Sequence, residues 1–397
     1  MLFRRSLQLL GLVLVTVIWP TNAHAYAWMI RHGYAQCAQC HVDPSGSGAL
    51  TAYGHGLSEF VLRTHYDFED HGTSDPTLGN FLFGAVELPE QFDFGADLRA
   101  LSLHSKVTNA PLQSELIWMQ VEAKATLQDG PVVASATLGY SPKGALGAAL
   151  SRNQDSTVVS REHWLGLYVD EPRRTLLRLG RMNQPFGIRS IEHTLWARAY
   201  TGTDTNDQQQ FGAALSYDGE QFRAELMGIA GSWQIRPDVF RQRGYSGFAE
   251  YLMAPRLALG VSSRIVHLEL DPRTFREEWK HAHGVLGRWG TPWQPLVLLG
   301  EWDYVFESPK YAPRRTGIVG YVQADLEATQ GVHFLATAEA SNVSSGSAPL
   351  SWGGWLSYAW FFAPHADIRL DNLYQSFASS AGRTGALSFL VQGHLSL

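Results

Sequence analysis

Apolar and polar residues alternate through most of the chain, from about residue 91 to residue 397. The alternation runs in segments of about 8 to 13 residues. Because successive side chains of a β-strand point to opposite faces, each segment predicts a strand with one apolar and one polar face. In the segment Glu115–Leu127, the expected apolar face carries Ile117, Met119, Val121, Ala123, Ala125 and Leu127, and the expected polar face carries Gln120, Glu122, Lys124 and Thr126.

About sixteen such segments follow one another, and their connections alternate in length. Those after even-numbered segments are short, as at 128–130 and 218–219, whereas several after odd-numbered segments are longer, as at 144–161 and 185–208. Outer-membrane barrels have short periplasmic turns and long outer loops, and a soluble sandwich, the alternative, has no reason to alternate. The segments are centred near residues 98, 121, 137, 165, 178, 213, 225, 248, 261, 284, 300, 321, 335, 357, 368 and 391.

The sequence therefore predicts an all-β fold, a transmembrane antiparallel β-barrel of about sixteen strands, with both termini periplasmic. Charges confined to one face of each strand suit a polar lumen, and the apolar faces suit the lipid of the outer membrane. The stretch 187–198 lies in the longest expected outer loop, and its apolar content suggests that it folds back into the mouth. The charged residues expected to point inward are Glu122, Lys124, Arg223, Glu225, Glu301, Asp303, Asp367, Arg369 and Asp371.

Aromatic residues near segment ends are candidates for the two belts at the membrane interfaces. Trp164, Trp293, Trp352 and Tyr374 are examples. Tryptophan and tyrosine prefer that depth because their rings are amphipathic. Each could equally belong to an ordinary core.

The segment before the barrel is rich in glycine and proline and predicts loops with one or two short helices. Helical spacing of apolar residues is clearest over Leu57–Thr64. The run His65–His71 resembles a metal site, but carboxylates on a loop are usually exposed, so we interpret it as a solvated linker. We expect three parts: a signal peptide at 1–25, a small N-terminal domain with its linker at 26–90, and the barrel at 91–397.

The export signal rests on three features. Arg4 and Arg5 precede an apolar run at 9–19, and Ala23-His24-Ala25 suits cleavage. The run has about 11 residues, whereas a spanning helix needs about 20, so a retained anchor is the less favoured alternative. Export together with a barrel pattern predicts the bacterial outer membrane.

Composition changes this picture at two points. The formal net charge is −6 and no run of lysine or arginine appears, which argues against a nucleic acid partner. The chain has only two cysteines, Cys37 and Cys40, with His41 directly after the second. No cysteine is then left over for a disulfide elsewhere.

The run Cys37-Ala38-Gln39-Cys40-His41 matches the attachment motif of c-type haem. In such a motif each thiol adds to a haem vinyl group and the histidine ligates the iron. A zinc site would need further ligands at finger-like spacing, and a thioredoxin-like pair would need a βαβ setting, so both alternatives are weaker. We therefore expect one covalent haem c on Cys37, Cys40 and His41.

The sixth ligand of the iron stays open. Met29, His32 and His55 are the main candidates, with a small preference for a histidine, and His65 and His71 are more distant ones. Each has a simpler role: methionine packs well on apolar surfaces, and the histidines could be exposed or could bind a haem propionate. Residues expected to wrap the haem edge are Tyr34, Tyr53, Gly46 and Gly48.

A single haem motif near the start, followed by about sixteen predicted strands, resembles the fused monohaem cytochrome-porins of the bacterial outer membrane. The resemblance covers the predicted mature chain in architecture, and its specific part is 28–53 with Cys37, Cys40 and His41. The best-known members of that family look like iron oxidases. The resemblance implies a haem domain tucked into or beneath the barrel that passes electrons between extracellular ferrous iron, or another external donor or acceptor, and periplasmic cytochromes or other carriers.

Three functions remain open from the sequence. The first is outer-membrane electron transfer, in which the protein is a redox carrier that could act as a ferrous-iron oxidase. The second is a diffusion porin with an accessory periplasmic haem domain. The third is a haem peroxidase or sensor, which needs an open sixth position on the iron.

Overall fold

A computed structural model describes residues 27–66, 80–140, 158–190, 192, 194–205, 207–346, 349–379 and 382–397. The predicted signal peptide and His71 lie outside these residues. Among them, no helix is long and apolar enough to cross a membrane.

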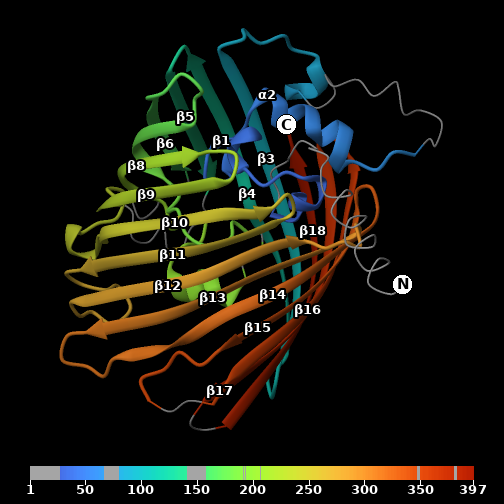
Figure 1. Ribbon diagram of the computed structural model, residues 1–397. Helices are drawn as coiled ribbons and strands as arrows, with labels where there is room; N and C mark the ends of the chain where they lie inside the picture. Colours follow the sequence, from blue (N-terminus) through green and yellow to red (C-terminus); the bar gives the residue numbers. More distant parts are fainter. Residues whose placement is uncertain are drawn as a thin grey trace, which may run out of the picture.

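Sixteen antiparallel strands form a closed barrel in which each strand pairs with its neighbours in the chain, and β18 pairs with β3 (Figure 1). Each predicted segment centre falls in a different strand, so the predicted fold class and strand number are confirmed. The strands are β3 (Phe92–Val107), β4 (Leu112–Asp129), β5 (Val132–Tyr140), β6 (Val158–Tyr168), β7 (Thr175–Met182), β8 (Gln210–Asp218), β9 (Phe222–Gly231), β10 (Arg243–Ala254), β11 (Leu257–Leu268), β12 (Glu278–Gly290), β13 (Leu296–Pro309), β14 (Arg315–Thr329), β15 (Val332–Ser341), β16 (Ser351–Ala363), β17 (Ala366–Ser379) and β18 (Gly382–Ser396).

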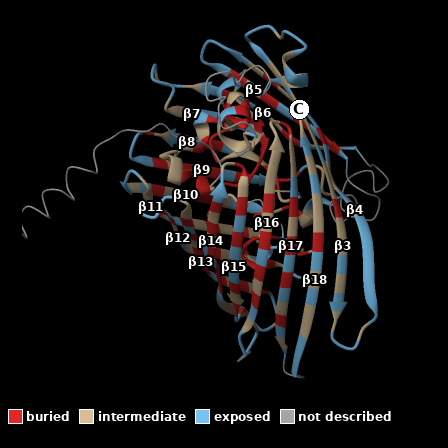
Figure 2. Cartoon of the chain, turned by 90° about the vertical axis from the view of Figure 1, so that its right-hand side faces the viewer, coloured by how far each residue is buried: buried red, intermediate tan, exposed pale blue. Residues whose placement is uncertain are grey.

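The two ends of the barrel differ in their connections. One end, here called the turn end, carries the short turns, the start of β3 and the last residue, Leu397. The other, here called the loop end, carries the longer connections at 183–209, 232–242 and 269–277. The predicted alternation is incomplete, because β3–β4 and β17–β18 are joined at the loop end by short connections. At the loop end the long strands β3 and β4, with 16 and 18 residues, lengthen the barrel wall in place of a long loop (Figure 2).

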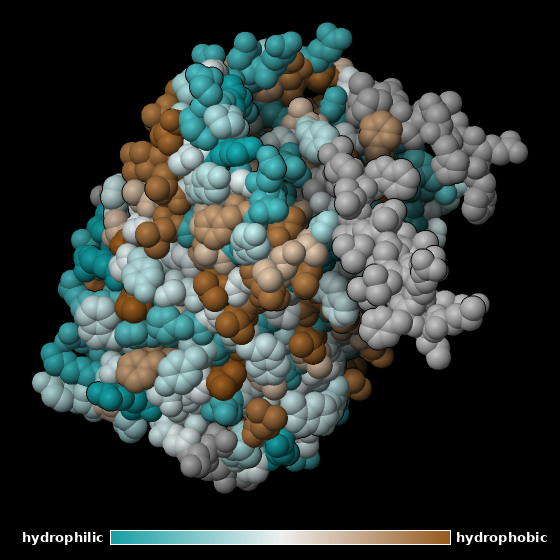
Figure 3. Space-filling view, viewed as in Figure 1, coloured by the Kyte–Doolittle hydropathy of each residue, from teal (hydrophilic) through white to brown (hydrophobic). Residues whose placement is uncertain are grey.

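The wall has an apolar outer face and a polar inner face. Val285 and Leu356 on the outer face are 58% and 67% exposed, whereas the lumen-facing Glu301 and Asp303 are completely buried. Apolar side chains are spread over the outside of the barrel (Figure 3). All nine charged residues predicted to point inward lie buried or partly buried on the inner face.

One strand departs from the predicted alternation. In β4, Gln120 pairs with Arg99 of β3 but Trp118 pairs with Ala100, so Met119 is an extra residue, a β-bulge. The bulge turns Ile117 and Met119 into the lumen, where they pack against a buried cluster, and the prediction that both share the apolar outer face is wrong.

Trp164 is a second exception to the predicted faces. It is only 4% exposed and packs in a lumen cluster, so it belongs to the core and not to an interfacial belt. The other three belt candidates, Trp293, Trp352 and Tyr374, are exposed on the outside.

Residues 27–66, here called the plug, lie in the turn end of the barrel (Figure 1). Their helix begins earlier than predicted because Thr51 caps it, with its Oγ1 accepting a hydrogen bond from Gly54 N at 3.1 Å. The predicted Leu57–Thr64 helix is therefore wrong in its bounds. The elements are η1 (Ala27–His32), η2 (Cys37–Gln39), a hairpin of β1 (His41–Asp43) and β2 (Ser47–Leu50), α2 (Ala52–Leu57) and a π-helical turn, η3 (Ser58–Leu62); η5 (Phe81–Gly84) follows before β3.

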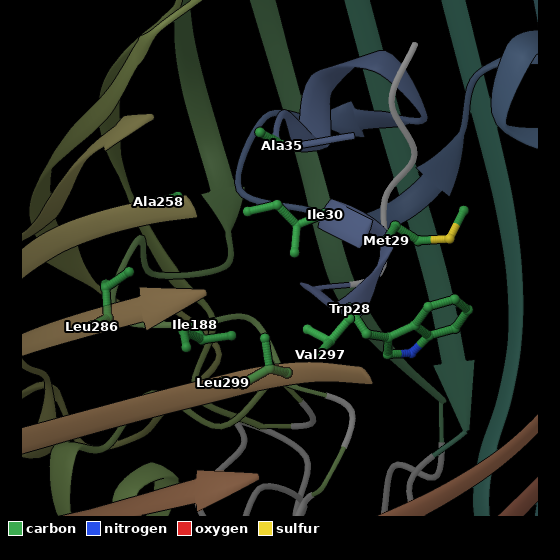
Figure 4. Packing of buried hydrophobic residues seen from close by; sticks show 9 residues of the cluster. All are labelled: Trp28, Met29, Ile30, Ala35, Ile188, Ala258, Leu286, Val297 and Leu299. Carbon is green, nitrogen blue, oxygen red and sulfur yellow. The ribbon is translucent and has the colours of Figure 1, made fainter. Parts of the chain in front are cut away.

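Residues 183–209, here called the inner loop, fold back from the loop end into the lumen, as predicted from 187–198, and include the helix α4 (Trp196–Thr201). A further short helix, η6 (Asp238–Phe240), lies in the next long connection. Plug and inner loop meet: Ile188 packs with Trp28 and Ile30 in a cluster completed by the barrel wall (Figure 4). The lumen is thus occupied from both ends.

Candidate functional site

The Cys-x-x-Cys-His run lies inside the barrel at the turn end. Cys37 starts η2 and its Sγ accepts a hydrogen bond from Nη1 of Arg223 in β9 at 2.8 Å. Just before it, the side chain of Arg288 in β12 donates to the carbonyl of Ala35 at 2.7 Å. Cys37 and Cys40 are 8% and 2% exposed, and no disulfide joins them. The Cys37 thiol is therefore held against the inner wall.

Two glycines give the motif its local shape. Gly46 has a φ of +90°, and a Cβ there would lie 2.9 Å from the Sγ of Cys37, so glycine keeps the space beside the thiol open. Gly54 in α2 packs directly on the backbone of Cys40, whose carbonyl accepts the Thr51 amide at 2.8 Å. The backbone of α2 is therefore in direct contact with the backbone of the motif.

His41 begins β1 and has an unusual environment. Its Nδ1 is buried and has no hydrogen-bond partner among the residues that the structure describes. Burial, helped by the positive charge of Lys124, lowers the pKa of His41 to about 4. The imidazole is therefore neutral near neutral pH, which is the form that binds a metal.

A cavity of about 270 Å³ adjoins the motif, close to the lower end of the usual size range for cofactor sites. From the plug it is lined by Cys40 and His41 together with apolar residues such as Leu50 and Leu57. The thiol of Cys40, a histidine with an orphaned nitrogen and an apolar surface line this cavity, and the thiol of Cys37 lies beside Gly46, which also lines it. Two thiols, a histidine and an apolar surface are the donor set and surroundings that a c-type haem requires. The residues present fit that group.

The structure separates the distal-ligand candidates. Met29 and His55 both line the cavity that Cys40 and His41 line. Met29 leaves the plug on the side opposite to Ile30 (Figure 4), and Nε2 of His55 lies 3.2 Å from Oδ2 of Asp93.

His32 is placed elsewhere. Its Nε2 accepts a hydrogen bond from Arg31 at 3.0 Å and lies 3.4 Å from Glu327, at a groove on the turn end. His65 is described but does not line the cavity, and over the described ranges no group of three or more histidine, cysteine or acidic residues suits a metal ion. Tyr34 and Tyr53 are paired by their hydroxyls at 3.4 Å.

Buried charges attach the plug to the wall. Arg178 of β7, completely buried, lies with Nη1 2.9 Å from Oδ1 of Asp43 and also pairs with Glu225 of β9. Lys124 Nζ donates to the carbonyl of Gly48 at 3.2 Å. Asp43 and Arg178 were not identified from the sequence, because nothing in a single strand shows which plug residue its lumen face will meet.

The inner loop is attached in the same way. Glu301 of β13 accepts the amide of Ile188 at 2.6 Å and Nη2 of Arg198 at 3.0 Å. Arg189 of the loop reaches the plug, where its Nη2 donates to Ser45 Oγ at 2.7 Å. Several lumen charges are therefore structural partners of the two inserted segments, and others pair within the wall, as Arg161 does with Glu122.

Comparison with known proteins supports the fold. No family model matches the sequence, and no curated protein matches it significantly. Among solved structures, OmpT of Vibrio cholerae is similar with a TM-score of 0.59 and 10% identity over 79% of this chain and 99% of that one. An anion-selective porin from Comamonas acidovorans gives 0.55 and 11% over 77% and 99%. The outer membrane channel DcaP of Acinetobacter baumannii gives 0.53 and 8% over 79% and 99%.

This chain has the fold of an outer-membrane porin barrel. At such low identity the likeness concerns the fold alone. It carries no information on the plug's cysteines.

Replacing Gly54 by alanine should destabilise the plug by about 1–3 kcal/mol, because the new methyl group overlaps the carbonyl oxygen of Cys40. Gly56→Ala is the matched control: it lies in the same helix with open space around it, and should stabilise by about 0.5–1 kcal/mol. Hydrogen exchange of the Thr51 and His55 amides, which are bonded within the plug, measures both changes. Equal effects of the two substitutions would contradict the close packing.

Replacing Arg178 by glutamine should loosen the plug by about 3–5 kcal/mol, because two buried carboxylates lose their shared cation. The Ser45 amide, bonded to Asp43 Oδ1 at 2.8 Å, reports on that site by hydrogen exchange. In the control, Arg174→Gln removes an exposed pair with Glu220 and should cost less than about 1 kcal/mol. Unchanged protection of Ser45 in Arg178→Gln would show that this ion pair does not hold the plug.

Proposed function

We propose that the chain is an electron-transfer protein of the bacterial outer membrane, with one haem c bound covalently by Cys37 and Cys40 and ligated by His41. The observation that carries the proposal is the burial of this motif against the lumen wall, where Cys37 contacts Arg223. A motif hanging free outside the barrel would instead favour an accessory domain. Placed in the lumen, a redox centre stands within the structure that crosses the apolar layer.

A haem supplies an iron centre that accepts and releases one electron. The chain provides what such a centre needs around it. The apolar outer face of the barrel suits lipid, and the plug and inner loop together narrow the lumen around the motif. Short turns face the periplasm in barrels of this kind, so we place the plug and its partners, periplasmic cytochromes or similar carriers, on that side. The external partner is a donor such as ferrous iron or an acceptor at the loop end.

His55 is our first choice for the sixth ligand, and Met29 is the alternative. Both line the cavity next to His41, whereas His32 is engaged by Arg31 and Glu327 outside it.

His55→Ala should convert the absorption spectrum of the haem protein from six-coordinate low-spin to five-coordinate high-spin, and Met29→Leu should leave it unchanged. The reverse result would assign the ligand to Met29. A wild-type spectrum that is already five-coordinate would favour a peroxidase or sensor, because those functions need the open position.

A diffusion porin is the second candidate function. The solved structures with this fold are described as porins and channels, and they favour this function over electron transfer, for which they carry no evidence. Solutes would then pass between the plug, the inner loop and the wall. The two candidates differ in what crosses the membrane, so transport measurements separate them.

The deciding experiment uses the full chain in liposomes that enclose a redox dye. External ferrous iron should reduce the dye faster through wild-type protein than in empty vesicles. The matched control, Cys37→Ser with Cys40→Ser, keeps the barrel but cannot hold haem covalently and should match empty vesicles.

Equal dye reduction in all three preparations would end the electron-transfer proposal. Ion conductance in planar bilayers tests the other candidate in the same preparations. A large steady conductance that is independent of the two cysteines would establish the porin.

A further inference from the structure

The cavity beside His41 has two chemically different faces. Its plug face is mainly apolar and carries the haem motif, with Met29, Ala49, Leu57 and Leu62 among its lining residues. Its wall face, formed chiefly by β3, β4 and the region of β16, β17 and β18, carries most of the charged side chains of the cavity. A ligand that fills such a cavity has an apolar body and a polar, charged edge.

Four basic side chains line the cavity, and three of them have partners in the protein. Lys124 pairs with Asp97, and Arg161 pairs with Glu122. Arg189 of the inner loop donates to Ser45 of the plug at 2.7 Å. These three cations are engaged in holding the strands, the plug and the inner loop together.

Arg99 of β3 is the fourth, and it differs. Its Nε is buried without an acceptor, and over the described part of the chain Arg99 makes no hydrogen bond or ion pair. Such a group costs free energy unless something satisfies it.

The neighbours of Arg99 are themselves occupied. Across the strands Arg99 pairs in register with Gln120 and His394. Gln120 donates to Glu122 at 2.6 Å, and His394 lies between Asp97, at 3.2 Å, and Asp367, at 2.7 Å. Among the described residues these carboxylates pair with other side chains and not with Arg99, so the positive charge of Arg99 stays unpaired at the cavity.

We propose that Arg99 binds a propionate carboxylate at the edge of the haem carried by Cys37 and Cys40. This inference rests on the proposed function. A haem has an apolar macrocycle with two carboxylates on one edge, which matches the two faces of the cavity. The planar guanidinium of arginine suits a carboxylate with two parallel hydrogen bonds. Arg99 is a positioning residue, because it acts on the edge of the group and not on the iron.

The pairing has a measurable electrical consequence. A cation beside the haem favours the state that has gained an electron. Arg99→Gln should therefore lower the midpoint potential. Arg99→Lys, which keeps the charge but not the planar fork, should restore much of it. Covalent attachment does not depend on Arg99, so these variants should hold the same amount of haem as the wild type.

The experiment measures haem content and midpoint potential, the latter across a pH series, for the full chain in detergent. Arg173→Gln is the matched control: Arg173 lies in an exposed turn, donates to the Gly130 carbonyl and does not line the cavity. Its potential should equal that of the wild type. In Arg99→Gln the pH dependence of the potential should begin at higher pH, because a propionate without its cation takes up a proton more easily.

The outcomes are distinct. Covalent haem in the wild type with an unchanged potential and pH profile in Arg99→Gln overturns the role of Arg99 and leaves the proposed function standing. Absence of covalent haem in the wild type overturns the proposed function, and this inference with it. If Arg99→Gln fails to fold, Arg99→Lys decides: the proposal expects its midpoint potential to lie slightly below that of the wild type, and a potential and pH profile that both equal those of the wild type contradict fork-like binding of a carboxylate.

Discussion

Every charge that points into a closed barrel needs a partner inside it, and this constraint organises the molecule. The sixteen-strand wall carries acidic and basic residues on its inner face. An unpaired ion buried there would cost several kcal/mol, roughly. Some partners lie on other strands of the wall, as Asp97 does for Lys124, and others come from two segments that are not part of the wall. Arg178 of the wall pairs with Asp43 of the plug, and Glu301 of the wall pairs with Arg198 of the inner loop.

Buried ion pairs of this kind add little net stability, because desolvation offsets most of the attraction. Their value lies in specificity: an inserted segment that shifts by one residue loses its partners. The same network that keeps the plug in register therefore keeps the motif against the lumen wall, with Cys40 and His41 beside one cavity. In this view the mixed charges of the lumen serve the placement of the motif more than the passage of a solute.

The sequence predicted the barrel well because its signal is local. A two-residue period survives in each strand, and each of the sixteen predicted centres lies in a separate strand. The prediction from sequence failed where the direction of a side chain depends on the neighbouring strand. The bulge at Met119 and the burial of Trp164 arise from register and curvature, which no single segment records. The helix of the plug was misplaced because capping by Thr51 outweighed the apolar spacing further on.

By itself the sequence determined the residues and spacing of the motif and the strand count, since each depends on residues that are close together in the chain. Only the tertiary structure decided that Met29 and His55, and not His32, share a cavity with His41. It also decided that Arg99 lines that cavity and, over the residues that the structure describes, has no hydrogen-bond acceptor for its Nε. The physical reason is the closure of the barrel. Closure brings residues that are hundreds of positions apart in the sequence to the same level along the barrel axis, and they can pair only when the last strand, β18, meets the first, β3.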